Sequence, residues 1–152
     1  MPSKFGLHGI SANKIVPLVR RAHDGGAYYT VAKMVNDASP LVDIAAIEPR
    51  TITVARYTNP NPTYEALQGV ENWTQSDREH FAQVSIQHIF NNANAAQLKA
   101  VKYFGVINEP DNKGFYDKAG LALIELAKEA NRRNIKLALP ALPQGTPEYA
   151  DM

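Results

Sequence analysis

The stretch YFGVINEPDN, residues 103–112, is an apolar run that ends abruptly in an amide, a carboxylate and a proline. Short apolar runs bounded by polar and proline residues are typical of strands in the interior of a sheet. Pro110 fixes its own φ angle and biases the preceding residue towards extended geometry, which would keep the end of the strand rigid. The stretch therefore predicts a buried strand over 103–108, with Asn108 and Glu109 as candidate functional residues at its tip.

Strand patterns of this kind alternate with helical periodicity along the whole chain. We expect strands over 4–10, 27–37, 51–58, 103–108 and 135–142. We expect helices between Ser11 and Gly25, from Ser76 to about Leu98, and over 115–134, and a short helix or turn over 39–46. Buried strands that alternate with helices predict a parallel sheet covered by helices.

Several residues indicate where these helices begin and end. Gly25-Gly26 is expected to stop the first helix, and Asn134 the last one. Ser76 and Glu79 have the spacing of a capping box, which predicts a helix start there. The apolar spacing of the last helix predicts an inward face made of Leu123, Ile124, Leu126, Ala127 and Ala130.

The composition is that of an ordinary globular domain. The chain has 152 residues, of which 45% are hydrophobic, a formal net charge of +1 and no cysteine. The length suggests one domain over 1–152, and the charge gives no sign of a nucleic-acid or membrane partner. No apolar stretch has the length of a transmembrane helix and no signal peptide is visible, so the sequence leaves the compartment open, cytoplasmic or extracellular.

Two architectures fit the alternation of strands and helices. A doubly wound nucleotide-binding sheet would carry a glycine-rich phosphate loop after its first strand, but GLHGISAN (6–13) does not have the G-x-G-x-x-G spacing. A (β/α)8 TIM-type barrel gathers polar residues at the carboxyl ends of its strands. Such residues do follow the expected strands: His8, Lys33, Asn36, Asp37, Arg56, Tyr57, Asn108, Glu109 and Gln144. We therefore predict an α/β fold of the barrel type, with about five βα units present.

Asn108-Glu109-Pro110 resembles the signature of the large clan of retaining (β/α)8-barrel glycoside hydrolases, in which it ends strand four. The layout is also similar to that of uncharacterised glycosidase-like barrel proteins of bacteria and phages. The resemblance implies that Glu109 is the general acid/base and that Asn108 binds the sugar 2-hydroxyl. A second Glu-Pro pair, Glu48-Pro49, precedes an expected strand, and we interpret Glu48 as a turn or helix-end residue.

The chain departs from the pattern of this clan in one respect. Retaining enzymes use two carboxylates about 5–5.5 Å apart. The resemblance implies that the nucleophile ends strand seven, whereas only five strands are recognised here. Three explanations stay open: the chain is the N-terminal portion of a longer barrel, a second copy or another polypeptide completes it, or it binds carbohydrate without cleaving it. Whether it is an enzyme, a glycosidase when completed, is left open; the alternative is a non-catalytic carbohydrate-binding or assembly protein.

Four further residues are candidates for the wall of a substrate pocket: His8, Lys33, Asn36 and Arg56. Lys33 also raises a third hypothesis, a Schiff-base lysine of an aldolase-like barrel, although a salt bridge inside the barrel is the interpretation we prefer for it.

Trp73 and Tyr64, in the long loop 59–75, form either a stacking platform for a sugar or ordinary loop packing, which we prefer. No group of histidines and carboxylates has metal-ligand spacing, so we expect no metal and no cofactor.

A five-stranded open sheet would leave strand edges and apolar surface uncovered, so we predict that the isolated chain self-associates or pairs with a complementing barrel half. Light scattering at micromolar concentration should give a mass above that of one chain. A single sharp monomer peak would contradict this prediction.

Overall fold

The computed structural model describes residues 2–3, 6–9, 12–107 and 116–138. The chain divides into two compact units. The first comprises Met1–Tyr57 and Phe90–Gly105, and the second comprises Thr58–Ile89 and Val106–Met152. Each unit has its own secondary structure and buried residues.

The first unit is built on a parallel four-stranded sheet. Its strands are β2 (Leu7–Gly9), β4 (Val31–Val35), β5 (Ile52–Arg56) and β6 (Tyr103–Gly105), and they pair in the order β2-β4-β5-β6. Spatial order therefore follows chain order. Two further strands, β1 (Pro2–Ser3) and β3 (Tyr28–Tyr29), form a separate parallel pair. The predicted α/β fold with a parallel sheet is confirmed.

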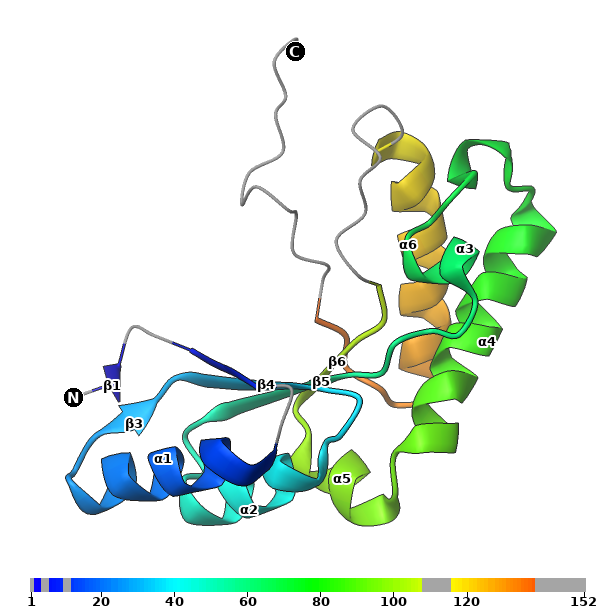
Figure 1. Ribbon diagram of the computed structural model, residues 1–152. Helices are drawn as coiled ribbons and strands as arrows, with labels where there is room; N and C mark the ends of the chain where they lie inside the picture. Colours follow the sequence, from blue (N-terminus) through cyan, green and yellow to red (C-terminus); the bar gives the residue numbers. More distant parts are fainter. Residues whose placement is uncertain (1, 4–5, 10–11, 108–115, 139–152) are drawn as a thin grey trace, which may run out of the picture. The chain divides into compact units, whose positions relative to one another are not determined.

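Three helices cover one face of this sheet: α1 (Ala12–Asp24), α2 (Ser39–Ile47) and α5 (Ala95–Ala100) (Figure 1). Burial alternates along the strands, because successive side chains point to opposite faces. The side chains towards the helices are almost completely buried: Ala32, Met34, Thr53, Ala55 and Phe104. Those between them define what we call the second sheet face, and they are half-buried or exposed: His8, Val31, Lys33, Val35, Ile52, Val54, Arg56, Tyr103 and Gly105.

The second unit contains α3 (Pro62–Glu65), the 3₁₀ helix η1 (Val70–Asn72), α4 (Gln75–Asn92, whose last residues belong to the first unit) and α6 (Tyr116–Arg132). Its buried apolar side chains come from η1, α4, α6 and the stretches beside them: Leu67, Val70, Phe81, Ala82, Ile86, Ile89, Val106, Ile107, Ala119, Ala122, Leu126 and Ala130. The stretch 59–75, expected to be a loop, thus contains the helical turns α3 and η1, and two of its side chains, Leu67 and Val70, are completely buried.

Two predicted helix ends are confirmed, those at Gly26 and Asn134. Gly26 adopts φ +74°, and the N–H of Ala27 donates to the carbonyl of Ala22 over 2.8 Å. Asn134 adopts φ 56°, and the N–H of Ile135 donates to the carbonyl of Ala130 over 2.8 Å. Both are Schellman ends, in which a left-handed residue lets the chain bond back across the last turn.

We expected one helix from Ser76 to about Leu98, and this prediction was wrong. The structure has two helices there, α4 and α5. The reciprocal capping bonds are made by Thr74 and Asp77: the Thr74 N–H donates to Asp77 Oδ2 over 2.8 Å, and the Asp77 N–H donates to Thr74 Oγ1 over 3.3 Å. Glu79 instead accepts a bond from the Gln75 side chain over 2.7 Å. The capping residue lies two positions earlier than expected, because Thr74 satisfies the same requirement as Ser76, and the helix begins at Gln75.

A second cap divides the rest of that helix. Asn94 Oδ1 accepts from the Gln97 N–H over 3.0 Å, and Gln97 Oε1 accepts from the Asn94 N–H over 2.9 Å. This capping box ends α4 at Asn92 and starts α5 at Ala95.

The inward face of α6 also differs from the prediction. Ile124 is 51% exposed and Ala127 is exposed, whereas Ala119 and Ala122 are buried. The helix carries apolar residues on two sides, and the smaller residues pack inward.

Of the strand expected over 135–142, the described part contains one β-bridge residue, Leu137.

In the first unit, the buried carboxylate of Glu48 lies near the amino end of the sheet and joins residues from several segments. Glu48 ends α2, is 1% exposed and accepts bonds from Arg50 Nε over 2.7 Å and from the Arg50 N–H over 3.1 Å. The ring of His23, near the end of α1, lies 3.3 Å from the same carboxylate. The Arg50 guanidinium lies 4.2 Å over the ring of Tyr28. The helix-end role expected for Glu48 is confirmed.

These contacts set the acid response of the fold. The hydrogen bonds from Arg50 outweigh the cost of burial and lower the pKa of Glu48 from 4.5 to about 2. Since the folded pKa is below the unfolded one, the contribution to stability is present above pH 4.5 and is lost as the pH falls towards 2.

We predict that Glu48→Gln lowers the free energy of unfolding at pH 7 by about 1–2 kcal/mol, because Arg50 and His23 lose a charged partner. The difference from the wild type should shrink in urea titrations between pH 4.5 and pH 2. Asp43→Asn, on the exposed side of α2, is the matched control and should behave as the wild type. A gap between Glu48→Gln and wild type that is unchanged at low pH would contradict the assignment.

Candidate functional site

The two residues on which the sequence interpretation depends most, Asn108 and Glu109, lie outside the described residues, as does Gln144. The described chain reaches Ile107, just after β6. The site can therefore be built from the four strands of the first unit, and the roles of Asn108 and Glu109 stay predictions.

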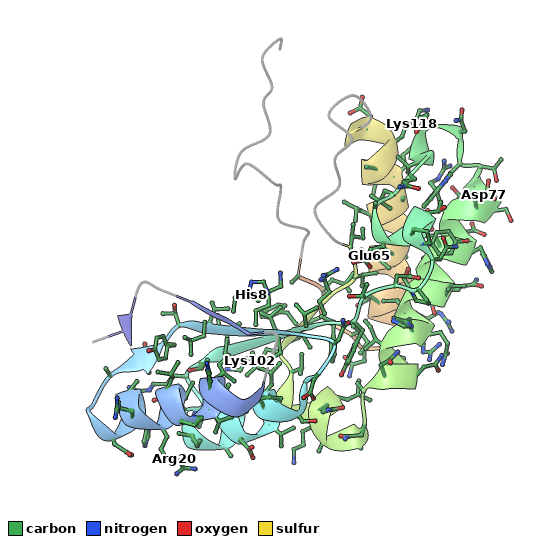
Figure 2. All side chains as sticks on the ribbon, in the orientation of Figure 1. His8, Arg20, Glu65, Asp77, Lys102 and Lys118 are labelled. Carbon is green, nitrogen blue, oxygen red and sulfur yellow. The ribbon has the colours of Figure 1, made fainter. Side chains whose placement is uncertain are left out.

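Strand register places four side chains in one row across the second sheet face. His8 pairs with Lys33, Lys33 with Val54, and Val54 with Tyr103. Along each strand, these four residues alternate with the residues that face the helices. Their side chains therefore all project from the second sheet face. Figure 2 shows His8 on the side of the sheet away from α1, whose Arg20 lies on the far side of that helix. His8 and Lys33, predicted from distant stretches of sequence, are thus neighbours.

The next row towards the carboxyl end contains Val35, Arg56 and Gly105. A Cβ atom on Gly105 would lie 3.5 Å from both Cβ and Cγ of Arg56. The first carbons of the Arg56 side chain therefore lie beside Gly105, which has no side chain of its own at this place.

Asn36 stands at the turn that follows β4. Its φ angle is 64°, a left-handed conformation in which asparagine is enriched among non-glycine residues. Its N–H donates to the carbonyl of Arg56 over 2.8 Å, which joins the ends of β4 and β5. The turn redirects the chain so that Asp37 Oδ1 accepts from the Ser39 N–H over 2.9 Å at the start of α2. Asn36 thus fixes the carboxyl edge of the sheet.

Tyr57 also lies at the carboxyl edge of the sheet, and it was not among the residues predicted to line the pocket. It is 6% exposed, and its hydroxyl has no hydrogen-bonding partner within the part of the chain that the structure describes. Burial, and to a lesser degree the charge of Asp37, raise the pKa of Tyr57. Its strand parity, shared with Thr53 and Ala55, could have signalled from sequence that it faces the helices rather than a pocket.

The described rows of the second sheet face are basic and apolar. They carry His8, Lys33 and Arg56, and no position among them is aspartate or glutamate. This surface can bind an anion or a polar ligand, but its described part supplies no carboxylate nucleophile.

The aromatic pair of the second unit is part of a packed cluster. The rings of Tyr64 and Trp73 lie edge to face at 5.8 Å, and both contact Phe81, at 5.5 and 5.3 Å. Phe81 is fully buried. These contacts are those of ordinary loop packing, the interpretation preferred from sequence, and the role of a sugar platform stays a prediction.

Among the described residues, no three histidine or acidic side chains come together as metal ligands would. Nor does any described helix combine the length and the apolar character that crossing a membrane requires.

Comparison with protein-family models, with curated proteins and with solved structures found no match to this chain.

Proposed function

We propose that this chain is the N-terminal part of a (β/α)8 barrel that binds, and when completed hydrolyses, a carbohydrate. Glu109 is the proton donor, Asn108 the ligand of the sugar 2-hydroxyl, and His8, Lys33, Asn36 and Arg56 belong to the surrounding wall. The domain would extend over 1–152 and form one part of a longer barrel.

One observation carries the proposal: the strand that leads into Asn108-Glu109-Pro110, β6, is the fourth strand of a parallel sheet whose spatial order follows chain order. In a barrel, each strand pairs with the next one along the chain, and all helices lie on the outer face. A doubly wound sheet instead reverses its strand order and carries helices on both faces. The first unit has sequential order and helices on one face.

For cleavage of a glycosidic bond, this part of the chain would contribute chiefly the side chains of Glu109 and Asn108. A protonated Glu109 gives its proton to the glycosidic oxygen as the bond to the sugar carbon breaks, and the amide of Asn108 bonds to the 2-hydroxyl as the ring flattens. The second carboxylate must come from outside the described sheet face, from further strands of the same barrel or from a complementing polypeptide. Without it, the chain would act as a carbohydrate-binding protein.

The test compares two aryl glycosides that differ in their leaving group. A phenyl glycoside needs a proton on its poor leaving group, whereas a dinitrophenyl glycoside does not. We predict that, in a barrel completed by its second carboxylate, Glu109→Gln lowers kcat/KM for the phenyl glycoside by about 10²-fold or more and leaves kcat/KM for the dinitrophenyl glycoside within a few-fold of the wild type.

Glu65→Gln, at the end of α3 in the second unit, serves as the control for loss of a carboxylate elsewhere. Equal rates for wild type and Glu109→Gln on the phenyl glycoside, or no cleavage by either protein, would remove the catalytic claim for this chain. Binding of β-linked oligosaccharides without turnover would then favour the non-catalytic alternative.

A further inference from the structure

We infer that the second unit binds a small apolar group, an aromatic ring or a short alkyl chain, in a cavity between α6 and the segments that flank it. The inference goes beyond the proposed function and does not depend on it, because its test involves neither a sugar nor Glu109.

The cavity has a volume of about 220 Å³ and is lined by residues of three segments, all of them within the second unit. Residues 106–107 follow β6, and residues 137–138 follow α6. The remaining lining residues are Leu123, Leu126 and Ala127 of α6. Their spacing of three and four residues places them on one face of the helix.

The lining of the cavity selects for an apolar occupant. Every described residue that lines it is apolar, so their side chains offer a ligand neither a hydrogen-bonding group nor a charge. Protein interiors contain few voids larger than a water molecule, and a buried water needs polar partners. An apolar cavity of about 150 Å³ accepts a benzene ring. A cavity of this size and lining therefore suits one aromatic ring or a chain of a few carbons.

The burial of the lining residues shows how such a ligand enters. Val106, Ile107 and Leu126 are 7%, 5% and 3% exposed, so they belong to the core of the unit. Leu123 is half-buried and Ala127 is exposed. The cavity therefore extends from the core to the surface at α6, and a ligand can reach it without unfolding of the unit.

Small side chains contribute to the space. Two of the lining residues, Ala127 and Ala138, are alanines. A leucine at position 127 would add three carbons at the exposed end of the cavity. Alanine and leucine are both good helix formers, so this change should close the site while α6 is kept.

The test compares two ligands of nearly the same shape on the full chain, p-xylene and hydroquinone. Calorimetry should show saturable binding of p-xylene. Hydroquinone carries hydroxyl groups at opposite ends of its ring, so one of them must enter the apolar end of the cavity in either orientation. It should bind at least about tenfold more weakly, because that hydroxyl loses its hydrogen bonds to water.

Methyl NMR spectra locate the bound ligand. Addition of p-xylene should shift the methyl signals of Val106, Ile107 and Leu126. The methyl signals of Leu18, which is 43% exposed on α1 in the first unit, serve as the control and should not shift.

Variants change the size of the cavity in both directions. Ala127→Leu should weaken p-xylene binding at least about tenfold, because the added carbons take the space of the ligand. Ala46→Leu makes the same change at an exposed position of α2 and should bind as the wild type does. Leu123→Ala enlarges the cavity and should raise the affinity for butylbenzene relative to p-xylene by about fivefold or more. Circular dichroism and thermal melting identify a variant that fails to fold, and Leu123→Ala then tests the site independently of Ala127→Leu.

Four results would overturn the inference. The first three are no saturable binding of p-xylene, equal affinity for p-xylene and hydroquinone, and equal losses in Ala127→Leu and Ala46→Leu. The fourth is a methyl shift at Leu18 as large as those of the lining residues, since it indicates general adsorption of apolar molecules to the surface.

Self-association gives a further control. If the protein has a mass above that of one chain and the mass falls when p-xylene is added, the cavity holds a side chain of another copy, which also overturns the inference. None of these results bears on the effect of Glu109→Gln, which tests the proposed function separately.

Discussion

The pairing of parallel strands in chain order is the constraint on which the rest of the first unit depends. Because β2, β4, β5 and β6 lie side by side in sequence order, all of their carboxyl ends meet at one edge and all of their side chains of one parity share one face. That pairing brings His8 beside Lys33 and sets Arg56 one row further on. Helices α1, α2 and α5 bury the opposite face, so the two faces of the same strands have separate roles.

The two ends of the strands also differ in chemistry. At the amino end, the buried Glu48 carboxylate accepts hydrogen bonds from Arg50 and lies 3.3 Å from the ring of His23. At the carboxyl half, the second sheet face carries basic side chains and no described carboxylate, and the turn at Asn36 is left-handed. This contrast explains why two Glu-Pro pairs in one chain deserve different interpretations: Glu48 stabilises the fold, and Glu109 is proposed to act on a ligand.

The sequence predicted the order of strands and helices because buried strands and amphipathic helices differ in period. It predicted the helix ends at Gly26 and Asn134 because few residues tolerate a left-handed conformation. It misplaced the start of α4, since Thr74 and Asp77 offer the same capping chemistry as Ser76 and Glu79 only two residues away. It misjudged Ile124 because α6 is apolar on two sides and local periodicity cannot choose between them. For the site, it named His8, Lys33, Asn36 and Arg56 by their expected places at strand ends, but Lys33 lies in the middle of β4. The register of these residues depends on long-range pairing that no local pattern contains.

The central claim is that β6 is the fourth strand of a sequentially ordered sheet, paired with β5. Since the chain has no cysteine, introduced thiols report this directly. Val54 and Tyr103 are register partners on neighbouring strands, whereas Lys33 lies two strands from Tyr103, about 10 Å away and too far for a disulfide. Under mild oxidation of the dilute protein, the account predicts an intramolecular disulfide in the double variant Val54→Cys with Tyr103→Cys, and none in Lys33→Cys with Tyr103→Cys. The reverse result would place β6 beside β4 and contradict the account.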